Sequence, residues 1–123
     1  MYDAAYAAVA RSRGAELATL DDVHVPEVVE SGATFAENAV LKATATAAAT
    51  GLPSVADDSG LCVDALNGMP GVLSARWSGA AATDESNLRL VLEQTADVPD
   101  DRRGAAFVCV AALAWPCASA ESR

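Results

Sequence analysis

Hydrophobic and polar positions alternate along this chain with a period that changes from one segment to the next. The clearest period runs through residues 35–50, where apolar side chains recur every four positions, as they do on one face of a helix. The recurring side chains are Phe35, Ala39, Ala43 and Ala47. We therefore expect a helix over residues 35–50 with this stripe buried.

The residues that flank this segment predict where the helix begins and ends. Thr34 supplies a hydroxyl cap, and Glu37 three residues later completes the capping-box pattern, in which two side chains satisfy exposed backbone amides. Gly51 supplies a left-handed stop and Pro53 prevents continuation. The sequence therefore predicts a helix that begins at Phe35 and ends near Thr50.

Two further helices are predicted on weaker periodicity. Residues 4–13 are rich in Ala and favour a helix by propensity, and Gly14 is expected to end it. Residues 84–95 follow Thr83, which is an N-cap candidate. The buried face of that helix is expected to comprise Leu88, Val91 and Leu92.

Short apolar runs predict the strands. Residues 54–56 and 61–65 flank the polar tetrapeptide Asp57-Asp58-Ser59-Gly60, which we expect to lie in irregular backbone at a strand end. Residues 105–115 form a continuous apolar run, which is typical of a strand covered on both faces. Because helices and strands alternate with no repeat or linker between them, we expect one α/β unit with a central mixed sheet flanked by helices.

Charge narrows the partners that this chain can bind. With 17 acidic and 8 basic side chains the net charge is -9, so a Lys/Arg-rich surface that tracks nucleic-acid phosphates is not expected. The apolar run over residues 105–114 is shorter than the roughly 20 residues that cross a bilayer, and the amino terminus has no signal pattern. We expect a cytoplasmic protein that binds neither nucleic acid nor membrane, and an anionic ligand would need a cation alongside it.

The tetrapeptide at residues 57–60 is the first candidate for chemistry. Alternation aims Asp57 and Asp58 in different directions, so that one carboxylate can hold Mg²⁺ or accept a proton from water while Ser59 contacts a phosphate oxygen. The alternative is an Asx-type turn with solvated carboxylates.

A second group lies around the amino end of the predicted 35–50 helix. Glu30 adds a carboxylate, the helix end attracts anions, and Lys42 adds an ammonium group, a combination that suits Mg-phosphate chemistry. The alternative places Glu37 in the helix cap and leaves Glu30 and Lys42 on a solvated surface. Asn38 is the exception to that alternative, because it is a mediocre helix former one turn before Lys42.

A third candidate follows the glycine-containing turns at residues 68–71. Arg76 offers a guanidinium that can grip a phosphate, and the adjacent Trp77 offers an indole that can stack on a base. In the alternative interpretation Trp77 packs inside the protein and Arg76 pairs with a carboxylate.

Taken together, four segments of the chain resemble the inosine triphosphate pyrophosphatase family, which acts on non-standard purine nucleotides. The segments are residues 30–43, 51–61, 68–76 with Gly79, and 82–87. Their order and spacing match the family from about residue 20 to residue 115. The resemblance implies the α/β fold of that family, incomplete here, as a single partial domain over residues 1–123.

The resemblance also implies an activity and a site. The family uses Mg²⁺ to hydrolyse inosine, deoxyinosine or xanthosine triphosphate between the α- and β-phosphates, which cleans the nucleotide pool. On this resemblance Asp58 is the proton acceptor and a metal ligand, and Glu30 and Asp57 are the other candidate ligands. Ser59 contacts substrate, with Lys42 and Arg76 as further candidates for phosphate contacts. The resemblance implies a homodimer as well.

Two departures from the family pattern affect this expectation. The chain lacks the Thr/Ser-x-Asn-x-x-Lys loop that opens the family pattern and the Gly-Phe-Gly-Tyr-Asp-Pro and Ser-His-Arg segments that close it. We therefore expect a family member truncated at both ends, with impaired turnover. The alternatives are a non-catalytic remnant or dimerising interaction module, and a Maf-like nucleotide pyrophosphatase.

Overall fold

The computed structural model describes residues 12–19, 25 and 27–117, so the helix predicted over residues 4–13 lies almost wholly outside the described residues. The described elements are α2 (Phe35–Thr50), β1 (Ser54–Val63), η1 (Asp64–Leu66), β2 (Met69–Pro70), η2 (Gly71–Arg76), α3 (Asp84–Gln94), η3 (Asp100–Arg102) and β3 (Ala105–Ala114). Helices and strands therefore alternate, which confirms the predicted α/β class.

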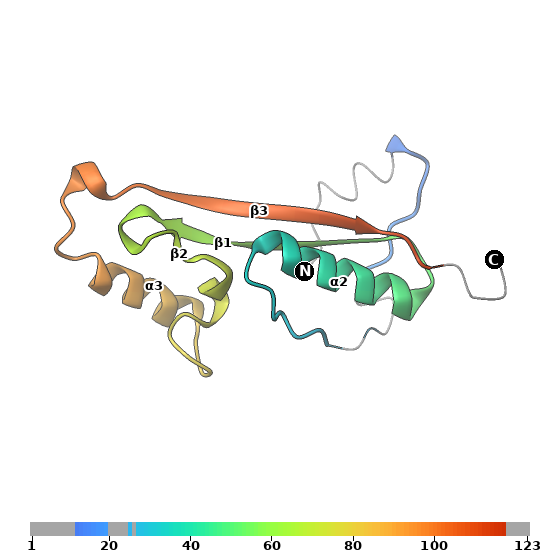
Figure 1. The fold of residues 1–123 in the computed structure, drawn as a ribbon, viewed down its shortest axis with the longest axis horizontal. Helices are drawn as coiled ribbons and strands as arrows, with labels where there is room; N and C mark the ends of the chain where they lie inside the picture. Colours follow the sequence, from blue (N-terminus) through green and yellow to red (C-terminus); the bar gives the residue numbers. More distant parts are fainter. Residues whose placement is uncertain (1–11, 20–24, 26, 118–123) are drawn as a thin grey trace.

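Two long antiparallel strands organise the molecule. The sheet order is β2-β1-β3, and Ser54 of β1 pairs with Ala114 of β3 while Val63 pairs with Ala105. The segment between β1 and β3 leaves and re-enters at the same end of the sheet (Figure 1). Both pairings among the described strands are consequently antiparallel, in place of the mixed pairing that the sequence suggested.

The polar tetrapeptide at residues 57–60 lies inside a strand and not in a turn. The register between β1 and β3 runs unbroken through it, from Ser54 to Val63. Asp and Gly disfavour strands, but pairing along a full neighbouring strand satisfies their backbone groups and overrides that preference. The expectation of irregular backbone at a strand end was therefore wrong.

Helix α2 has the bounds that its sequence predicted and lies across β1 and β3 (Figure 1). The Thr34 hydroxyl accepts from the Glu37 amide at 3.1 Å, and Gly51 adopts φ 69° at the other end. The buried side chains of the helix are Asn38, Ala39, Ala43 and Ala47. Because three of these are Ala, the helix backbone can lie close to the sheet. Phe35, expected in this stripe, is only half-buried.

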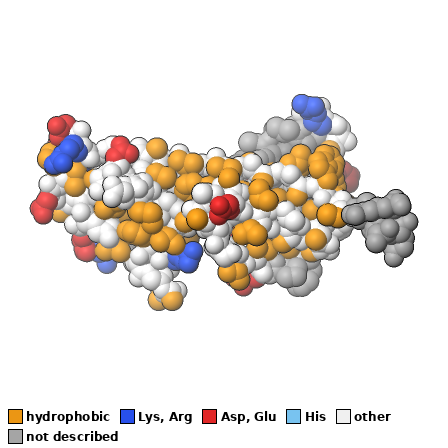
Figure 2. All heavy atoms as spheres, viewed as in Figure 1, with side chains coloured by type: hydrophobic (Ala, Val, Ile, Leu, Met, Phe, Trp, Pro, Cys, Tyr) orange, Lys and Arg blue, Asp and Glu red, His pale blue; other side chains and the backbone are white. Residues whose placement is uncertain are grey.

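The sheet face opposite α2 is uncovered among the described residues. Side-chain exposure alternates along β3, and its Phe107 and Leu113 are 84% and 58% exposed. Val55 of β1, which pairs with Leu113, is exposed on the same side. Figure 2, drawn from the same side as Figure 1, shows that hydrophobic side chains are also spread over the near surface of the molecule. Because α2 covers one face only, the expectation that this strand is covered on both faces was wrong.

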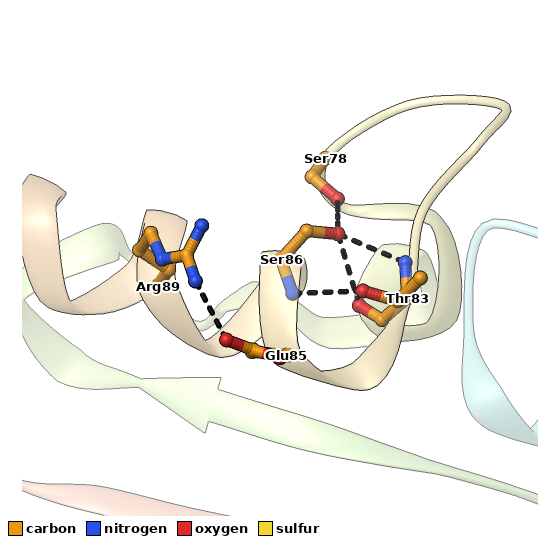
Figure 3. Close-up of polar contacts among 5 residues, drawn as sticks. All are labelled: Ser78, Thr83, Glu85, Ser86 and Arg89. Atoms are coloured by element: carbon orange, nitrogen blue, oxygen red, sulfur yellow. Dashed lines mark hydrogen bonds and ion pairs between the residues drawn. The ribbon is translucent and has the colours of Figure 1, made fainter.

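Helix α3 begins where its cap predicted. The Thr83 hydroxyl accepts from the Ser86 amide at 3.0 Å, and the Ser86 hydroxyl accepts from the Thr83 amide at 2.8 Å (Figure 3). Its buried residues are Asn87 and Val91, whereas Leu88 and Leu92 are exposed, because the helix contacts mainly the short η2 segment. The predicted apolar face was therefore right only at Val91. Within the described ranges, no helix is both long and apolar enough to span a membrane.

Candidate functional site

The fold brings together three of the residues predicted from the sequence. The Lys42 ammonium lies 2.7 Å from Oε1 of Glu30 and 3.6 Å from Oδ1 of Asp58. Lys42 comes from α2, Asp58 from the middle of β1, and Glu30 from the segment that precedes α2. This ion-paired cluster contradicts the alternative in which Glu30 and Lys42 are separately solvated.

The members of the cluster differ in their exposure to solvent. The Asp58 side chain is 10% exposed, that of Lys42 28% and that of Glu30 41%. Burial lowers the pKa of Lys42, but its hydrogen bond to Glu30 and the charges of Glu30, Asp58 and Asp57 outweigh that effect, so the net pKa is raised. Lys42 is therefore cationic at neutral pH and compensates the buried charge of Asp58.

Asn38 completes the surroundings of Asp58. Its side chain is 1% exposed, its Nδ2 donates to Oδ2 of Asp58 at 3.3 Å, and its Oδ1 accepts from the Gly32 amide at 2.7 Å. The sequence analysis singled out Asn38 as a mediocre helix former but gave it no role. The signal that could have done so is its place beside Ala39 in a buried stripe, where an amide side chain needs polar partners.

Gly32 allows the segment that carries Glu30 to approach the helix closely. A Cβ atom at position 32 would lie 2.7 Å from Oδ1 of Asn38 and 2.7 Å from Cβ of Glu37, distances that real contacts do not reach. Glu37 itself accepts from the Ala33 amide at 2.6 Å, one residue further from the helix than the expected capping box. The segment before α2 is thus fixed by two backbone amides, those of Gly32 and Ala33.

Asp57 and Ser59 lie on the other side of β1. Successive side chains of a strand point to opposite faces, so both residues are on the face away from α2, opposite Ala111 and Cys109 of β3. The structure therefore does not bring them to the side of the sheet that carries Asp58. Their roles as metal ligand and substrate contact stay predictions.

Arg76 lies apart from the cluster, at the end of η2. It is exposed, and its side chain forms no ion pair with any carboxylate of the described residues, contrary to the alternative interpretation. Its neighbour Trp77 is half-buried and donates from Nε1 to Oε1 of Gln94 at 2.9 Å. The Ser74 hydroxyl accepts from the Leu61 amide at 2.9 Å and thereby holds η2 against β1.

The donor set of the cluster fits Mg²⁺. Glu30 and Asp58 both present a carboxylate oxygen within ion-pair distance of one cation, the Lys42 ammonium. Mg²⁺ is usually held by one or two carboxylates, with water and substrate phosphates as the remaining ligands. In the part of the chain that the structure describes, no three or more His, Cys, Asp or Glu side chains converge on one point. The cluster thus supplies two carboxylate donors for such an ion.

Comparison with known proteins gives the relatives of this chain. The model of the Ham1 family matches residues 4–123. The dITP/XTP pyrophosphatase of Streptomyces coelicolor is 64% identical over 93 residues, which are 76% of this chain and 46% of the relative. That of Nocardia farcinica is 62% identical over 104 residues, which are 84% of this chain and 50% of the relative. The chain spans about half the length of these curated relatives.

Solved structures give a consistent result. The nucleoside-triphosphatase / dITP/XTP pyrophosphatase from Mycobacterium abscessus is 54% identical, with a TM-score of 0.76 over 92% of this chain and 59% of that chain. The Staphylococcus aureus Ham1 protein is 45% identical, with a TM-score of 0.67 over 74% of this chain and 46% of that chain. These similarities confirm the resemblance detected in the sequence.

Proposed function

Because this chain belongs to the Ham1 family, we propose that it carries the water-activating and cation-binding part of a nucleoside triphosphate pyrophosphatase. Its substrates would be inosine, deoxyinosine and xanthosine triphosphate, hydrolysed to the monophosphate and pyrophosphate, and its role would be to clean the cytoplasmic nucleotide pool. The observation that carries the proposal is the largely buried Asp58 carboxylate, which is held between Asn38 and Lys42 and lies beside Glu30.

Asp58 is the proposed proton acceptor. The Asn38 amide donates to one oxygen of the carboxylate and the Lys42 ammonium faces the other, so the group is held in place to accept a proton from water. As the oxygen of the attacking water bonds to phosphorus, its proton passes to Asp58. The bond between the α- and β-phosphates breaks, and pyrophosphate leaves.

Glu30 and Asp58 would hold the Mg²⁺ ion. When bound, Mg²⁺ neutralises the phosphate charge that a protein of net charge -9 would otherwise repel. The two carboxylates approach the Lys42 ammonium from different elements, Asp58 from the sheet and Glu30 from the segment before α2. Asp57 remains a further candidate ligand, since its charge is close enough to Lys42 to affect the pKa of that residue.

Three side chains are proposed to contact the substrate. Arg76 is exposed and has no carboxylate partner among the described residues, so its guanidinium is available to a phosphate. Lys42 would exchange part of its pairing with Glu30 and Asp58 for phosphate oxygens. Ser59 stays a candidate for substrate contact on the sequence resemblance alone, because it lies on the face of β1 opposite Asp58.

The test is pyrophosphate release from inosine triphosphate with Mg²⁺. We expect Asp58→Asn to lower the rate by about 100-fold or more, because a positioned proton acceptor contributes that much. Asp84→Asn, the same chemical change in the first turn of α3, should leave the rate unchanged. Full activity in Asp58→Asn would contradict the assignment of the proton acceptor. A folded wild-type chain that releases no pyrophosphate would contradict the activity itself.

A second candidate function, a dimerising interaction module, is favoured by the uncovered sheet. In the described part of the chain β3 pairs on one edge only, and its ten residues carry no charge. Such an edge favours pairing with another strand, so a second copy of this chain is the proposed partner. Light scattering should give a dimer mass, and Val110→Lys on β3 should reduce it to the monomer mass. A monomer in the unsubstituted chain would contradict this candidate.

A further inference from the structure

We propose that Asn38 is a positioning residue that fixes the Asp58 carboxylate in one orientation, an inference that rests on the proposed role of Asp58 as proton acceptor. Asn38 is the largest side chain that is almost completely buried among the described residues. It contacts Asp58 directly, whereas the other buried residues of its helix are all Ala.

The two contacts of Asn38 determine how its amide is oriented. The Gly32 amide N–H needs an acceptor, and the Asp58 carboxylate needs a donor. A side-chain amide has one end of each kind, so flipping it would lose both hydrogen bonds and bring two oxygen atoms together. Asp58 therefore always meets an N–H donor at its Oδ2 atom.

Asn38 and Lys42 act on Asp58 as a pair. They lie one turn apart on α2, so their side chains share one face of the helix. Nδ2 of Asn38 contacts Oδ2 of Asp58, and Nζ of Lys42 faces Oδ1. Rotation of the carboxylate would break both contacts, so the pair holds both oxygen atoms in place.

The same two residues also bind the segment that precedes the helix. Asn38 accepts a hydrogen bond from the Gly32 amide. Lys42 forms an ion pair with Glu30, which lies two residues before Gly32 in the same segment. The carboxylates of Asp58 and Glu30 are thus both held by side chains from neighbouring turns of α2. A displaced Asn38 would move Asp58 relative to Glu30, which is the geometry that the proposed chemistry requires.

The chain contains a matched control in Asn87, which is also a buried amide. Its Oδ1 accepts from the Ser78 amide at 2.8 Å, as Asn38 accepts from Gly32. Its Nδ2, however, donates to the backbone oxygen of Ala75 at 3.1 Å and meets no ionisable group. The same substitution at both positions therefore separates the effect on Asp58 from the general cost of changing a buried amide.

The first test is a thermal unfolding cycle with Asn38→Asp and Asp58→Asn. Asn38→Asp keeps the shape and the acceptor for Gly32 but puts a carboxylate oxygen against Asp58, so the unfolding midpoint should fall by about 5–10 °C. When Asp58→Asn is also present, the new amide at position 58 can donate to position 38, and the fall should be less than half as large. Asn87→Asp should cost the same in both backgrounds. An equal fall for Asn38→Asp in both backgrounds would overturn the proposal.

The second test is steady-state pyrophosphate release from inosine triphosphate. For Asn38→Asp we expect kcat to fall between about 10-fold and 100-fold while KM changes by less than about twofold, because the proton acceptor is misplaced and the substrate contacts remain. Asn87→Asp should change neither constant. A change in KM alone would overturn the proposal. If the wild-type chain releases no pyrophosphate, the proposed function fails, while the unfolding cycle still decides whether Asn38 holds Asp58.

Discussion

The amino ends of α2 and α3 are built on the same plan. Each helix is capped by a Thr side chain, Thr34 in α2 and Thr83 in α3. Four residues after each cap stands a buried asparagine, Asn38 or Asn87. Each asparagine accepts a backbone N–H from the loop in front of its helix. The two helices thus use one local arrangement to tie a preceding loop to the helix.

The two ends differ in what the asparagine donates to. Asn87 donates to the backbone oxygen of Ala75, which makes a purely structural connection. Asn38 donates to the carboxylate of Asp58, which the ammonium of Lys42 also faces. The comparison teaches that a Thr cap followed four residues later by Asn does not by itself distinguish a purely structural asparagine from one that contacts a candidate catalytic residue. The strand or loop that the fold brings against the helix decides between them.

The loops that approach the two asparagines also differ. Ser78 carries a side chain there, and its hydroxyl donates to Oδ1 of Asn87 at 2.7 Å. The same hydroxyl lies 2.6 Å from the hydroxyl of Ser86, which in turn contacts Thr83 (Figure 3). The corresponding residue at α2 is Gly32, where no Cβ fits. The backbone of the loop before α2 therefore lies against the helix with no room for a side chain at position 32.

The largest expected effect comes from Gly32→Ala, which gives the loop before α2 a side chain, as Ser78 does in the loop before α3. The added Cβ would lie 2.7 Å from Asn38 and Glu37, so the segment must move away and the Gly32–Asn38 hydrogen bond must weaken. We expect the free energy of unfolding to fall by about 3 kcal/mol, which combines overpacking with a strained buried hydrogen bond. Urea unfolding followed by circular dichroism measures it.

The matched variant is Ser78→Ala, which keeps the Cβ and removes only the hydroxyl. Its cost should be about 1 kcal/mol, because the two hydrogen bonds of the hydroxyl, with Asn87 and Ser86, are both at least partly exposed to solvent. If the two variants cost the same, the close approach at Gly32 is not what separates the two helix ends.

Local signals in the sequence were enough to predict both helices. The cap at Thr34 and the stop at Gly51 act within a few residues of the helix ends, so the bounds of α2 could be predicted before any tertiary contact was known. The cap at Thr83 did the same for the start of α3.

The strand through residues 57–60 could not be predicted in this way. Its Asp, Ser and Gly residues disfavour strands, and only pairing with β3, about fifty residues later, extends β1 through them. An apolar run such as β3 likewise indicates how much surface prefers to be buried. It does not indicate which segment covers that surface, and in the described residues one face of the strand remains exposed.

The candidate site was predictable as a set of residue types and not as an arrangement. Glu30, Lys42 and Asp58 were each singled out, but their meeting depends on α2 crossing β1 at one particular turn. Asn38 was visible only as an unexplained polar residue. Its role follows from the burial of the stripe in which it stands, which is a tertiary fact.

A second prediction tests the charge that distinguishes α2 from α3. Lys42→Met should lower the free energy of unfolding by about 2 kcal/mol in metal-free buffer near pH 7, because Asp58 loses the cation that compensates its buried charge. Part of the interaction with Glu30 is screened, since that side chain is 41% exposed.

The pH dependence of this loss follows from the raised pKa of Lys42. A folded-state pKa above the ordinary value of 10.5 means that the contribution of Lys42 is fully present below pH 10.5 and is lost as the pH rises through the folded pKa. The difference between wild type and Lys42→Met should therefore be constant from about pH 7 to about pH 10 and shrink as the pH rises above about 10.5. Unfolding curves at a series of pH values measure it, and a difference that grows with rising pH would contradict it.

A third prediction concerns what the two helix ends share. Thr34→Ala and Thr83→Ala each remove one capping hydroxyl from an exposed amide, at 3.1 Å and 3.0 Å respectively. Each should lower the free energy of unfolding by about 1 kcal/mol. Chemical denaturation measures both. A cost at Thr34 several times that at Thr83 would mean that the cap itself supports the buried cluster and that the two ends differ even in this feature.

The smallest effect is expected where α3 has an ion pair without burial. Arg89 donates to Oε1 of Glu85 at 2.6 Å, one turn earlier on the helix (Figure 3), but the two side chains are 64% and 79% exposed. Water and salt screen such a pair, so Arg89→Ala should cost about 0.3–0.5 kcal/mol and less in high salt. Denaturation in low and high salt measures it. Both helices carry a short ion pair, 2.6 Å between Arg89 and Glu85 and 2.7 Å between Lys42 and Glu30. A larger loss for Lys42→Met than for Arg89→Ala would therefore come from the additional contact of Lys42 with the buried Asp58 and not from a shorter distance. A cost for Arg89→Ala equal to that for Lys42→Met would contradict this conclusion.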